Sequence, residues 1–153
     1  MSGERYRVEV MHGVNLDQLG RRDPQLYGTL TLAELEQRIA AEAGQLDMDT
    51  DFFHTNHEGE FVERLHALRD SATDGVILNP GAWTHYAWSL RDALEIAGLP
   101  AVEVHLSDVE QREPWRGVSV IGELCFATVS GRGPDGYGQA LGLLRERLDQ
   151  GQA

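Results

Sequence analysis

A carboxylate and an imidazole stand two residues apart in the segment V-E-V-H-L-S, residues 102–107. Alternate side chains of a β-strand point to the same face, so Glu103 and His105 are expected to lie side by side. A carboxylate beside an imidazole orients the ring and stabilises its protonated form, which suits a general acid. Both groups are costly to bury without partners, so this spacing favours a catalytic pair over a packing role.

A phenol and two guanidinium groups share one long loop, residues 13–30. A tyrosine has a pKa near ~10 and is a poor base at neutral pH unless a neighbouring cation favours its phenolate. Arg22, which follows Arg21 on the same loop as Tyr27, would supply that cation. The length of the loop is typical of a lid over a binding site. The alternative is that Tyr27 packs against the core and the arginines are solvated.

Two further segments carry groups that bind polar ligands. In N-P-G-A-W-T-H, residues 79–85, a strand ends at Asn79 and Thr84 is a plausible N-cap of the next helix. Asn79 and His85 are then placed to hydrogen-bond hydroxyls or a carboxylate, the alternative being turn chemistry and a surface histidine. Arg112 and Arg116 are four residues apart, so on one helical turn they would face the same way and grip an anionic or polyhydroxylated ligand.

Three other patterns predict structure rather than chemistry. The glycine-rich segment 131–136 matches a dinucleotide-binding pattern but follows the last predicted strand, so a turn before a helix is expected. His54 and His57 lack the spacing of helical metal ligands, and no third ligand is near them in the sequence. Cys125 lies in an apolar run and is expected to be a small core residue of a strand. The sequence therefore predicts no metal site.

Every one of the 13 basic residues is an arginine, and against 25 acidic residues they leave a net charge of −12. The absence of lysine excludes a Schiff-base lysine, a pyridoxal phosphate anchor, the lysine of a P-loop and the switch lysine of a receiver domain. The net charge disfavours a nucleic-acid partner, and an anionic ligand would need a local cluster of arginines. With one cysteine and a polar start that resembles neither a signal peptide nor a membrane span, a cytoplasmic protein without membrane attachment is expected.

The elements that must position these groups alternate between short β-rich runs and longer amphipathic stretches, which is typical of an α/β fold. We expect one domain over residues 1–153, with a flavodoxin-like, doubly wound sheet of five parallel strands. Ligands of such sheets bind at the carboxyl ends of the strands. The predicted strands are residues 6–12, 50–55, 75–79, 101–105 and about 121–129, and the predicted helices are residues 31–44, which a capping box opens, 59–71, 86–97 and 137–148.

The order of these segments resembles the type II 3-dehydroquinases, the 3-dehydroquinate dehydratases of the shikimate pathway. The resemblance covers essentially the whole chain. It is carried by G-V-N-L-x-x-L-G-R-R-x-P-x-x-Y-G from residue 13, N-H-E-G-E at 56–60, N-P-G-A-W-T-H-x-x-x-x-L-R-D-A at 79–93, V-E-V-H-L-S at 102–107, R-E-P-W-R at 112–116 and G-x-G-x-x-G-Y near the end.

This resemblance implies an anti-elimination of water through an enolate, with no cofactor and no metal. Tyr27, made accessible as the phenolate by Arg22, would remove a proton from the carbon next to the ketone. His105, supported by Glu103, would protonate the departing hydroxyl. Asn15 would help to hold a water molecule that stabilises the enolate.

The resemblance also implies how an anionic substrate is bound. Asn79 and the backbone N–H groups of Leu106 and Ser107 would hold its carboxylate, and His85 and Arg116 would bind the ring hydroxyls. Arg112 would shape the lid region. Asp92 would reach the site of a neighbouring subunit in a homododecamer, a tetramer of trimers.

The chain departs from the family pattern at three places. These are His12 and Val14, at the end of the first predicted strand and the start of the loop after it, Asp108 after Ser107, and Gly117 with Val118 after Arg116. The proposed acid and base survive all three changes, so these departures bear on substrate identity. One alternative is therefore a paralogue that dehydrates a related cyclic polyol acid such as an amino-dehydroquinate. Others are a non-catalytic ligand-binding homologue and a flavodoxin-like electron carrier.

Overall fold

The computed structural model describes residues 5–151 and has five parallel strands in one sheet, in the order β2-β1-β3-β4-β5. This is the strand order of the flavodoxin-like fold, so the predicted architecture is confirmed. Among the described residues, no helix is both long and apolar enough to cross a bilayer. The strands are β1 Tyr6–His12, β2 Met48–His54, β3 Gly75–Asn79, β4 Ala101–His105 and β5 Ala127–Ser130.

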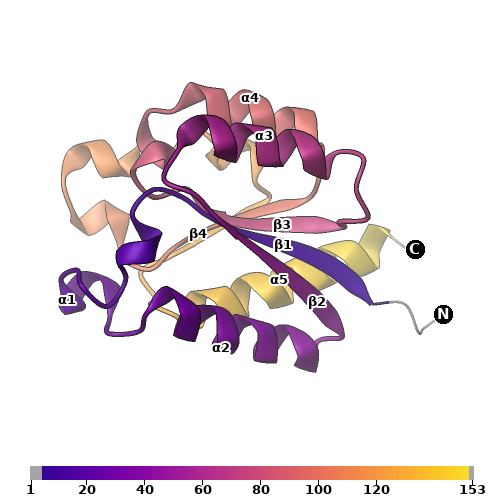
Figure 1. Ribbon diagram of the computed structural model, residues 1–153, viewed down its shortest axis with the longest axis horizontal. Helices are drawn as coiled ribbons and strands as arrows, with labels where there is room; N and C mark the ends of the chain where they lie inside the picture. The colour runs from indigo at the N-terminus through magenta and orange to yellow at the C-terminus, as the bar shows by residue number, and fades with distance from the viewer. Residues whose placement is uncertain (1–4, 152–153) are drawn as a thin grey trace.

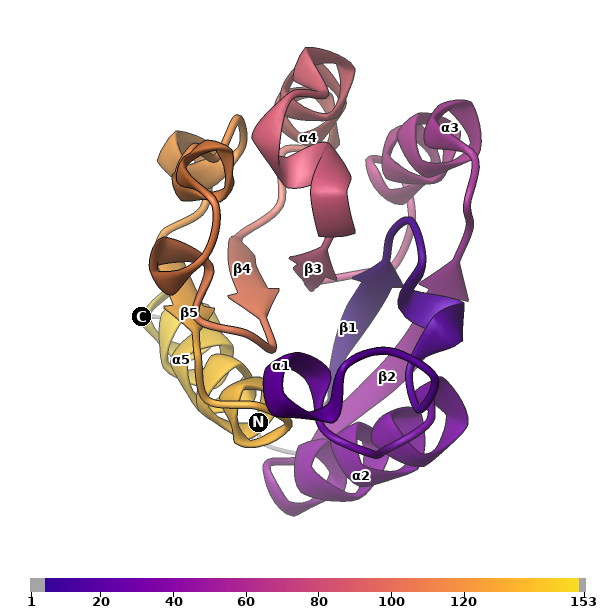
Figure 2. The same ribbon diagram turned by 90° about the vertical axis from the view of Figure 1, so that its left-hand side faces the viewer.

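Helices cover both faces of the sheet, as Figure 1 shows, with α2 and α5 on one face and α3 and α4 on the other. Each face has its own apolar core, because successive residues of a strand alternate between the two sides. The short helix α1 lies in front of the carboxyl ends of the strands (Figure 2). The helices are α1 Pro24–Tyr27, α2 Leu32–Gln45, α3 Glu58–Leu68, α4 Trp88–Ala97 and α5 Asp135–Gly151.

The register of the strands brings polar side chains to the same edge of the sheet. His12, the last residue of β1, is level with His54 of β2 and Asn79 of β3. In the other half of the sheet, His105 of β4 is level with Ser130 of β5. The carboxyl ends of the strands are therefore where the predicted ligand-binding groups gather.

Local sequence signals account for several boundaries. The hydroxyl of Thr31 accepts from the backbone N–H of Glu34, and the Glu34 carboxylate accepts from the backbone N–H of Thr31, so the predicted capping box opens α2. The strands predicted at 6–12, 75–79 and 101–105 have the predicted bounds. Strand β2 begins two residues earlier than predicted, and α3 ends at Leu68 rather than at residue 71.

Two expectations about local structure are wrong. Thr84 does not cap a helix; it is buried in a 3₁₀ turn, Gly81–His85, and α4 begins only at Trp88 after Ala87. Strand β5 is much shorter than the predicted 121–129, because a 3₁₀ turn occupies Gly122–Leu124. Cys125 therefore lies outside any strand, although its side chain still packs against the core under α3 and α4.

Candidate active site

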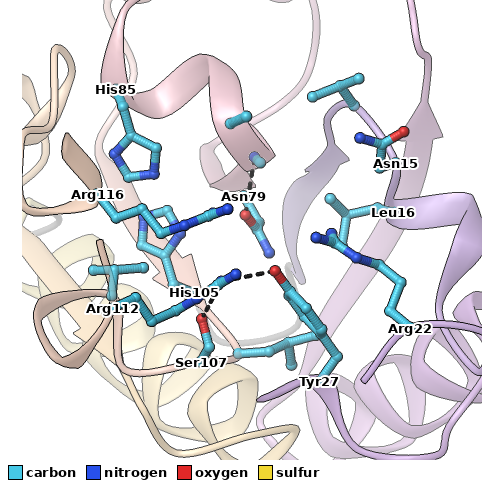
Figure 3. Close-up of a pocket in the computed structure, with 15 residues that line it drawn as sticks. Asn15, Leu16, Arg22, Tyr27, Asn79, His85, His105, Ser107, Arg112 and Arg116 are labelled. Carbon is cyan, nitrogen blue, oxygen red and sulfur yellow. Dashed lines mark hydrogen bonds between the residues drawn. The ribbon is translucent and has the colours of Figure 1, made fainter. Parts of the chain in front are cut away.

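A cavity of about 130 Å³ lies at the carboxyl edge of the sheet, between the loop that follows β1 and the segment that follows β4. Figure 3 shows Arg112 and Arg116 entering it from one side, and Arg22 and Asn15 from the other. Most residues singled out from the sequence line this cavity: Asn15, Arg22, Tyr27, Asn79, His85, His105, Leu106, Ser107, Arg112 and Arg116.

Glu103 and His105 form the hydrogen-bonded pair that their spacing predicts. The Nε2 atom of His105 lies 2.5 Å from Oε2 of Glu103, and both side chains are buried. The hydroxyl of Ser119 donates to the other carboxylate oxygen, Oε1, at 2.8 Å. Ser119 was missed from the sequence, because it lies 16 residues further along the chain in a segment without periodicity.

Two guanidinium groups contact Tyr27 in different ways. Arg22 lies over the face of the ring, with its Cζ atom 3.9 Å from the ring centroid. Arg112 donates from Nη1 to the Tyr27 hydroxyl at 2.7 Å and to the Ser107 hydroxyl at 3.1 Å. The sequence interpretation assigned the neighbouring cation to Arg22, whereas the structure places Arg112 directly on the hydroxyl oxygen. Two positive charges therefore lie against Tyr27, one on the ring face and one on the hydroxyl.

The expected pairing of Arg112 and Arg116 on one helical turn is wrong. Arg112 follows the 3₁₀ turn Val109–Gln111, and Arg116 lies in the next turn, Pro114–Gly117. Both side chains reach the cavity because the chain folds back between the two turns, which contact each other.

The imidazole of His85 is fixed by a backbone carbonyl. Its Nδ1 atom lies 2.6 Å from the carbonyl oxygen of Val118, so Nδ1 carries the hydrogen and Nε2 is left as an acceptor. Burial lowers the pKa of His85, which favours this neutral form. Val118 supplies only its backbone here, since its side chain is exposed. The departure from the family pattern at Gly117 and Val118 therefore leaves the contact to His85 intact.

The first loop approaches β3 closely. The N–H of Gly13 donates to the carbonyl of Asn79 at 2.8 Å, and a Cβ atom on Gly13 would lie only 2.2 Å from the carbonyl oxygen of Pro80. Asn15 adopts a left-handed conformation with φ of 70°, which asparagine tolerates better than most residues, and its N–H donates to Oδ1 of Asn56 at 2.8 Å. Asn79 is buried, and its Oδ1 accepts from the N–H of Gly81 at 3.1 Å.

Asp108 and Asp92 lie outside the cavity lining. The Asp108 carboxylate accepts from the N–H of Glu110 at 3.2 Å and caps the 3₁₀ turn Val109–Gln111. An asparagine could make the same cap. Because Asp108 is not among the residues that line this cavity, the departure adds no negative charge to its lining. Asp92 is exposed on α4, and its predicted contact with a neighbouring subunit stays a prediction.

The structure also places the glycine-rich segment 131–136, His54 and Cys125, for which no chemistry was predicted. Gly131 and Gly133 adopt positive φ and lead into α5, which confirms the predicted turn before a helix. His54 faces Asp17, with 3.7 Å between Nε2 and Oδ1, and residues 5–151 contain no group of three or more His, Cys, Asp or Glu side chains placed to hold a metal ion. Burial raises the pKa of the Cys125 thiol to about 12, which makes it a poor nucleophile.

The chain matches the family model described as dehydroquinase class II over residues 6–145. It is 43% identical over 146 residues to the 3-dehydroquinate dehydratase of Pelobacter propionicus, covering 95% of this chain and 98% of that relative. It is 46% identical over 138 residues to the 3-dehydroquinate dehydratase of Syntrophotalea carbinolica, covering 90% and 92% of the two chains.

Solved structures give the same result. The type II dehydroquinase of Propionibacterium acnes superposes with a TM-score of 0.87 at 35% identity, covering 94% of this chain and 99% of that one. The type II dehydroquinase of Butyrivibrio crossotus superposes with a TM-score of 0.89 at 33% identity, covering 93% and 99%. Fold, motif order and sequence identity therefore agree, and the chain belongs to the class II dehydroquinase family.

Proposed function

We propose that this protein is a 3-dehydroquinate dehydratase, a hydro-lyase that forms 3-dehydroshikimate for aromatic amino acid biosynthesis. The observation that carries the proposal is that the Tyr27 hydroxyl, held by Arg112, and the imidazole of the Glu103–His105 pair line one arginine-rich cavity. A base and an acid that face the same ligand are what an elimination of water requires. The names of relatives at 43% and 46% identity support the same substrate.

The reaction begins with proton removal by Tyr27. Its phenolate takes a proton from the carbon next to the ketone, and the electron pair of the broken C–H bond forms an enolate. Arg112 and Arg22 stabilise the phenolate before this step. Asn15, on the wall of the same cavity, holds a water molecule that donates to the enolate oxygen.

The reaction ends with loss of the hydroxyl on the β-carbon. The enolate collapses to the ketone, the new C=C bond forms, and the C–O bond breaks while His105 donates a proton, so that water departs. His105 must be protonated before this step, and the carboxylate of Glu103 stabilises that imidazolium form. Proton removal by tyrosine and proton donation by histidine leave a neutral phenol and a neutral imidazole, which exchange protons with solvent before the next cycle.

The cavity wall supplies the groups that bind an anionic polyhydroxylated ring. Asn79 and the N–H groups of Leu106 and Ser107 bind the carboxylate, and Arg116 donates to ring hydroxyls. His85 accepts from a ring hydroxyl through Nε2. The segment 13–30, which carries Arg22 and Tyr27, closes over the bound substrate as a lid.

The charge of the cavity wall argues against an amino-substituted substrate. The described residues that line the cavity include three arginines, Arg22, Arg112 and Arg116, and no aspartate or glutamate. An ammonium group on the ring would face like charges without a carboxylate to bind it. A substrate whose charge is a carboxylate and whose other substituents are hydroxyls fits this wall better.

The test is turnover of 3-dehydroquinate, followed by the absorbance of the conjugated product, with the amino-substituted analogue assayed beside it. We expect turnover of 3-dehydroquinate and a Tyr27→Phe variant at least about a hundredfold slower, since a positioned base contributes about that much. Tyr86→Phe is the matched control, because Tyr86 is exposed and lies outside the cavity lining. Turnover of the analogue alone, or an unchanged rate in Tyr27→Phe, would refute the proposal.

We further infer a cytoplasmic homododecamer, a tetramer of trimers, in which Asp92 reaches the site of a neighbouring copy. The exposure of Asp92 on α4, near exposed Trp88 of the same helix, supports this inference. Light scattering coupled to gel filtration measures the mass of the assembly directly. A mass other than that of twelve chains would refute the dodecamer, and the mass of a single chain would exclude a shared site.

A further inference from the structure

A third group extends the pair of Glu103 and His105 into a chain of hydrogen bonds. The Ser119 hydroxyl donates to Oε1 of Glu103 at 2.8 Å, and Oε2 of the same carboxylate accepts from Nε2 of His105 at 2.5 Å. Each oxygen of the carboxylate therefore has its own donor. An ionised carboxylate that lacks donors is costly to bury, so both contacts matter to Glu103, which is 1% exposed.

A second buried carboxylate on the same face of the sheet shows how differently Glu103 is held. Glu9 in β1 is fully buried, and both of its oxygens accept from Arg64, at 2.7 Å and 2.9 Å. Within residues 5–151, the ion-pair partner of Glu103 is His105 alone. Two groups therefore offset the cost of burying the Glu103 carboxylate. One is the imidazole of His105, which loses its positive charge when it acts as the acid, and the other is the hydroxyl of Ser119.

Backbone contacts place Ser119 independently of its hydroxyl. The residue before it, Val118, accepts from His85 through its carbonyl, and the N–H of Val120 donates to the carbonyl of Thr84 at 2.8 Å. Arg91 of α4 donates to the carbonyl of Val120 at 3.1 Å. Removal of the Ser119 hydroxyl should therefore leave the segment 118–120 in place.

We propose that Ser119 is a positioning residue for the acid step, a role that rests on the proposed function. By holding Oε1, it fixes the rotation of the Glu103 carboxylate so that Oε2 meets Nε2 of His105. The Nε2–H group of His105 then stays hydrogen-bonded to Glu103, and the proton on Nδ1 is the one transferred to the departing hydroxyl. Ser119 itself touches neither substrate nor reacting atoms.

The kinetic test compares Ser119→Ala with the conservative Ser119→Thr variant. We expect Ser119→Ala to lower kcat about tenfold or more with little change in KM, since a hydrogen bond to a charged group is worth about that factor. Ser119→Thr keeps a hydroxyl and should restore most of the loss. Ser130→Ala is the matched control. Ser119 and Ser130 both line a second cavity, which also contacts Glu103 and His105, and in the described part of the chain no side-chain hydrogen bond joins Ser130 to Glu103.

A double-mutant cycle separates positioning from a general loss of structure. If Ser119 acts through Glu103, Ser119→Ala should slow a Glu103→Ala enzyme by less than about twofold, because the carboxylate that the hydroxyl orients is gone. A structural defect would instead slow both backgrounds equally. Equal losses in the two backgrounds, or failure of Ser119→Thr to recover, would overturn the proposal.

A readout without substrate keeps this inference separate from the proposed function. Nitrogen-15 NMR of His105 at a pH where the ring is neutral reports which nitrogen carries hydrogen. We expect the Nε2-protonated tautomer in the unmodified protein and in Ser119→Thr, and a mixture of tautomers in Ser119→Ala. The same single tautomer in Ser119→Ala would overturn the positioning role, whatever substrate the enzyme uses; lack of turnover of 3-dehydroquinate would instead overturn the proposed function alone.

Discussion

Replacement of Arg112 by methionine tests the arrangement around the proposed base most directly. The side chain of Arg112 is 11% exposed, and its Nη1 atom binds both the Tyr27 and the Ser107 hydroxyls, at 2.7 Å and 3.1 Å. Methionine keeps much of the volume and removes the charge and every donor. Its effect should therefore report the loss of both contacts, of which the one to the phenol oxygen is the shorter.

The magnitude follows from the kind of contact that is lost. A hydrogen bond to a charged partner is worth about 1.5–3 kcal/mol, which corresponds to a loss of about tenfold to a hundredfold in kcat/KM for Arg112→Met. Arg112→Lys should recover part of this loss, because it restores the charge but not the planar fork. In a Tyr27→Phe background the change at position 112 should have a smaller effect, because only the contact to the Ser107 hydroxyl is left to lose.

The assay is steady-state turnover of 3-dehydroquinate, with circular dichroism and Tm measured on every variant. The control is Arg69→Met, which removes a guanidinium that donates to the carbonyl of Ile96, at the C-terminal ends of α3 and α4 and away from the cavity. We expect this control to stay within about twofold of the unmodified enzyme. A folded Arg112→Met enzyme within the same range would refute the assignment of Arg112 to the base.

Three further predictions concern stability and reactivity. Burial lowers the pKa of His85, so the stability that its neutral form contributes is present above the unfolded value of about 6.5 and is lost as the pH falls toward the folded pKa. Urea unfolding near neutral and mildly acidic pH should therefore show a smaller loss on acidification in His85→Gln than in the unmodified protein; an equal loss would refute this. Cys125, with a pKa raised to about 12 by burial, should resist iodoacetamide in the folded protein and react once the chain is unfolded, as mass spectrometry will show; fast labelling of the folded protein would contradict it. Thr31→Ala removes the capping box of α2 and should lower the free energy of unfolding by about 1 kcal/mol. An unchanged urea midpoint would mean that the cap does not contribute to stability.

The parts of the fold that the sequence predicts well are those with strong local signals. The strand at 75–79 is a short apolar run that begins at a glycine and ends at Asn79. The strand at 101–105 follows a proline and has valine at alternate positions, and the bounds of both strands are as predicted. The Glu103–His105 pair follows from the period of two in β4, which needs no knowledge of the rest of the fold.

The segment between β4 and β5 could not be predicted in the same way. Residues 106–126 form three 3₁₀ turns without a repeating apolar pattern, so nothing local places Arg112 on Tyr27 or Ser119 on Glu103. These contacts join residues 85 and 16 positions apart and depend on how the turns pack. Tertiary packing, rather than periodicity, determines this half of the site.

The same contacts give a physical meaning to the absence of lysine. The three guanidinium groups that line this cavity make contacts of different kinds. Arg22 lies 3.9 Å over the ring of Tyr27 and Arg116 lies 4.2 Å over the ring of Trp115, whereas Arg112 donates from Nη1 to two hydroxyls. A compact ammonium cannot stack in this way or present a planar fork. Arginine therefore suits these three positions better than lysine would. An exposed pair such as Arg7 and Asp51, joined by one contact from Nε, needs only a positive charge, so composition alone accounts for arginine there.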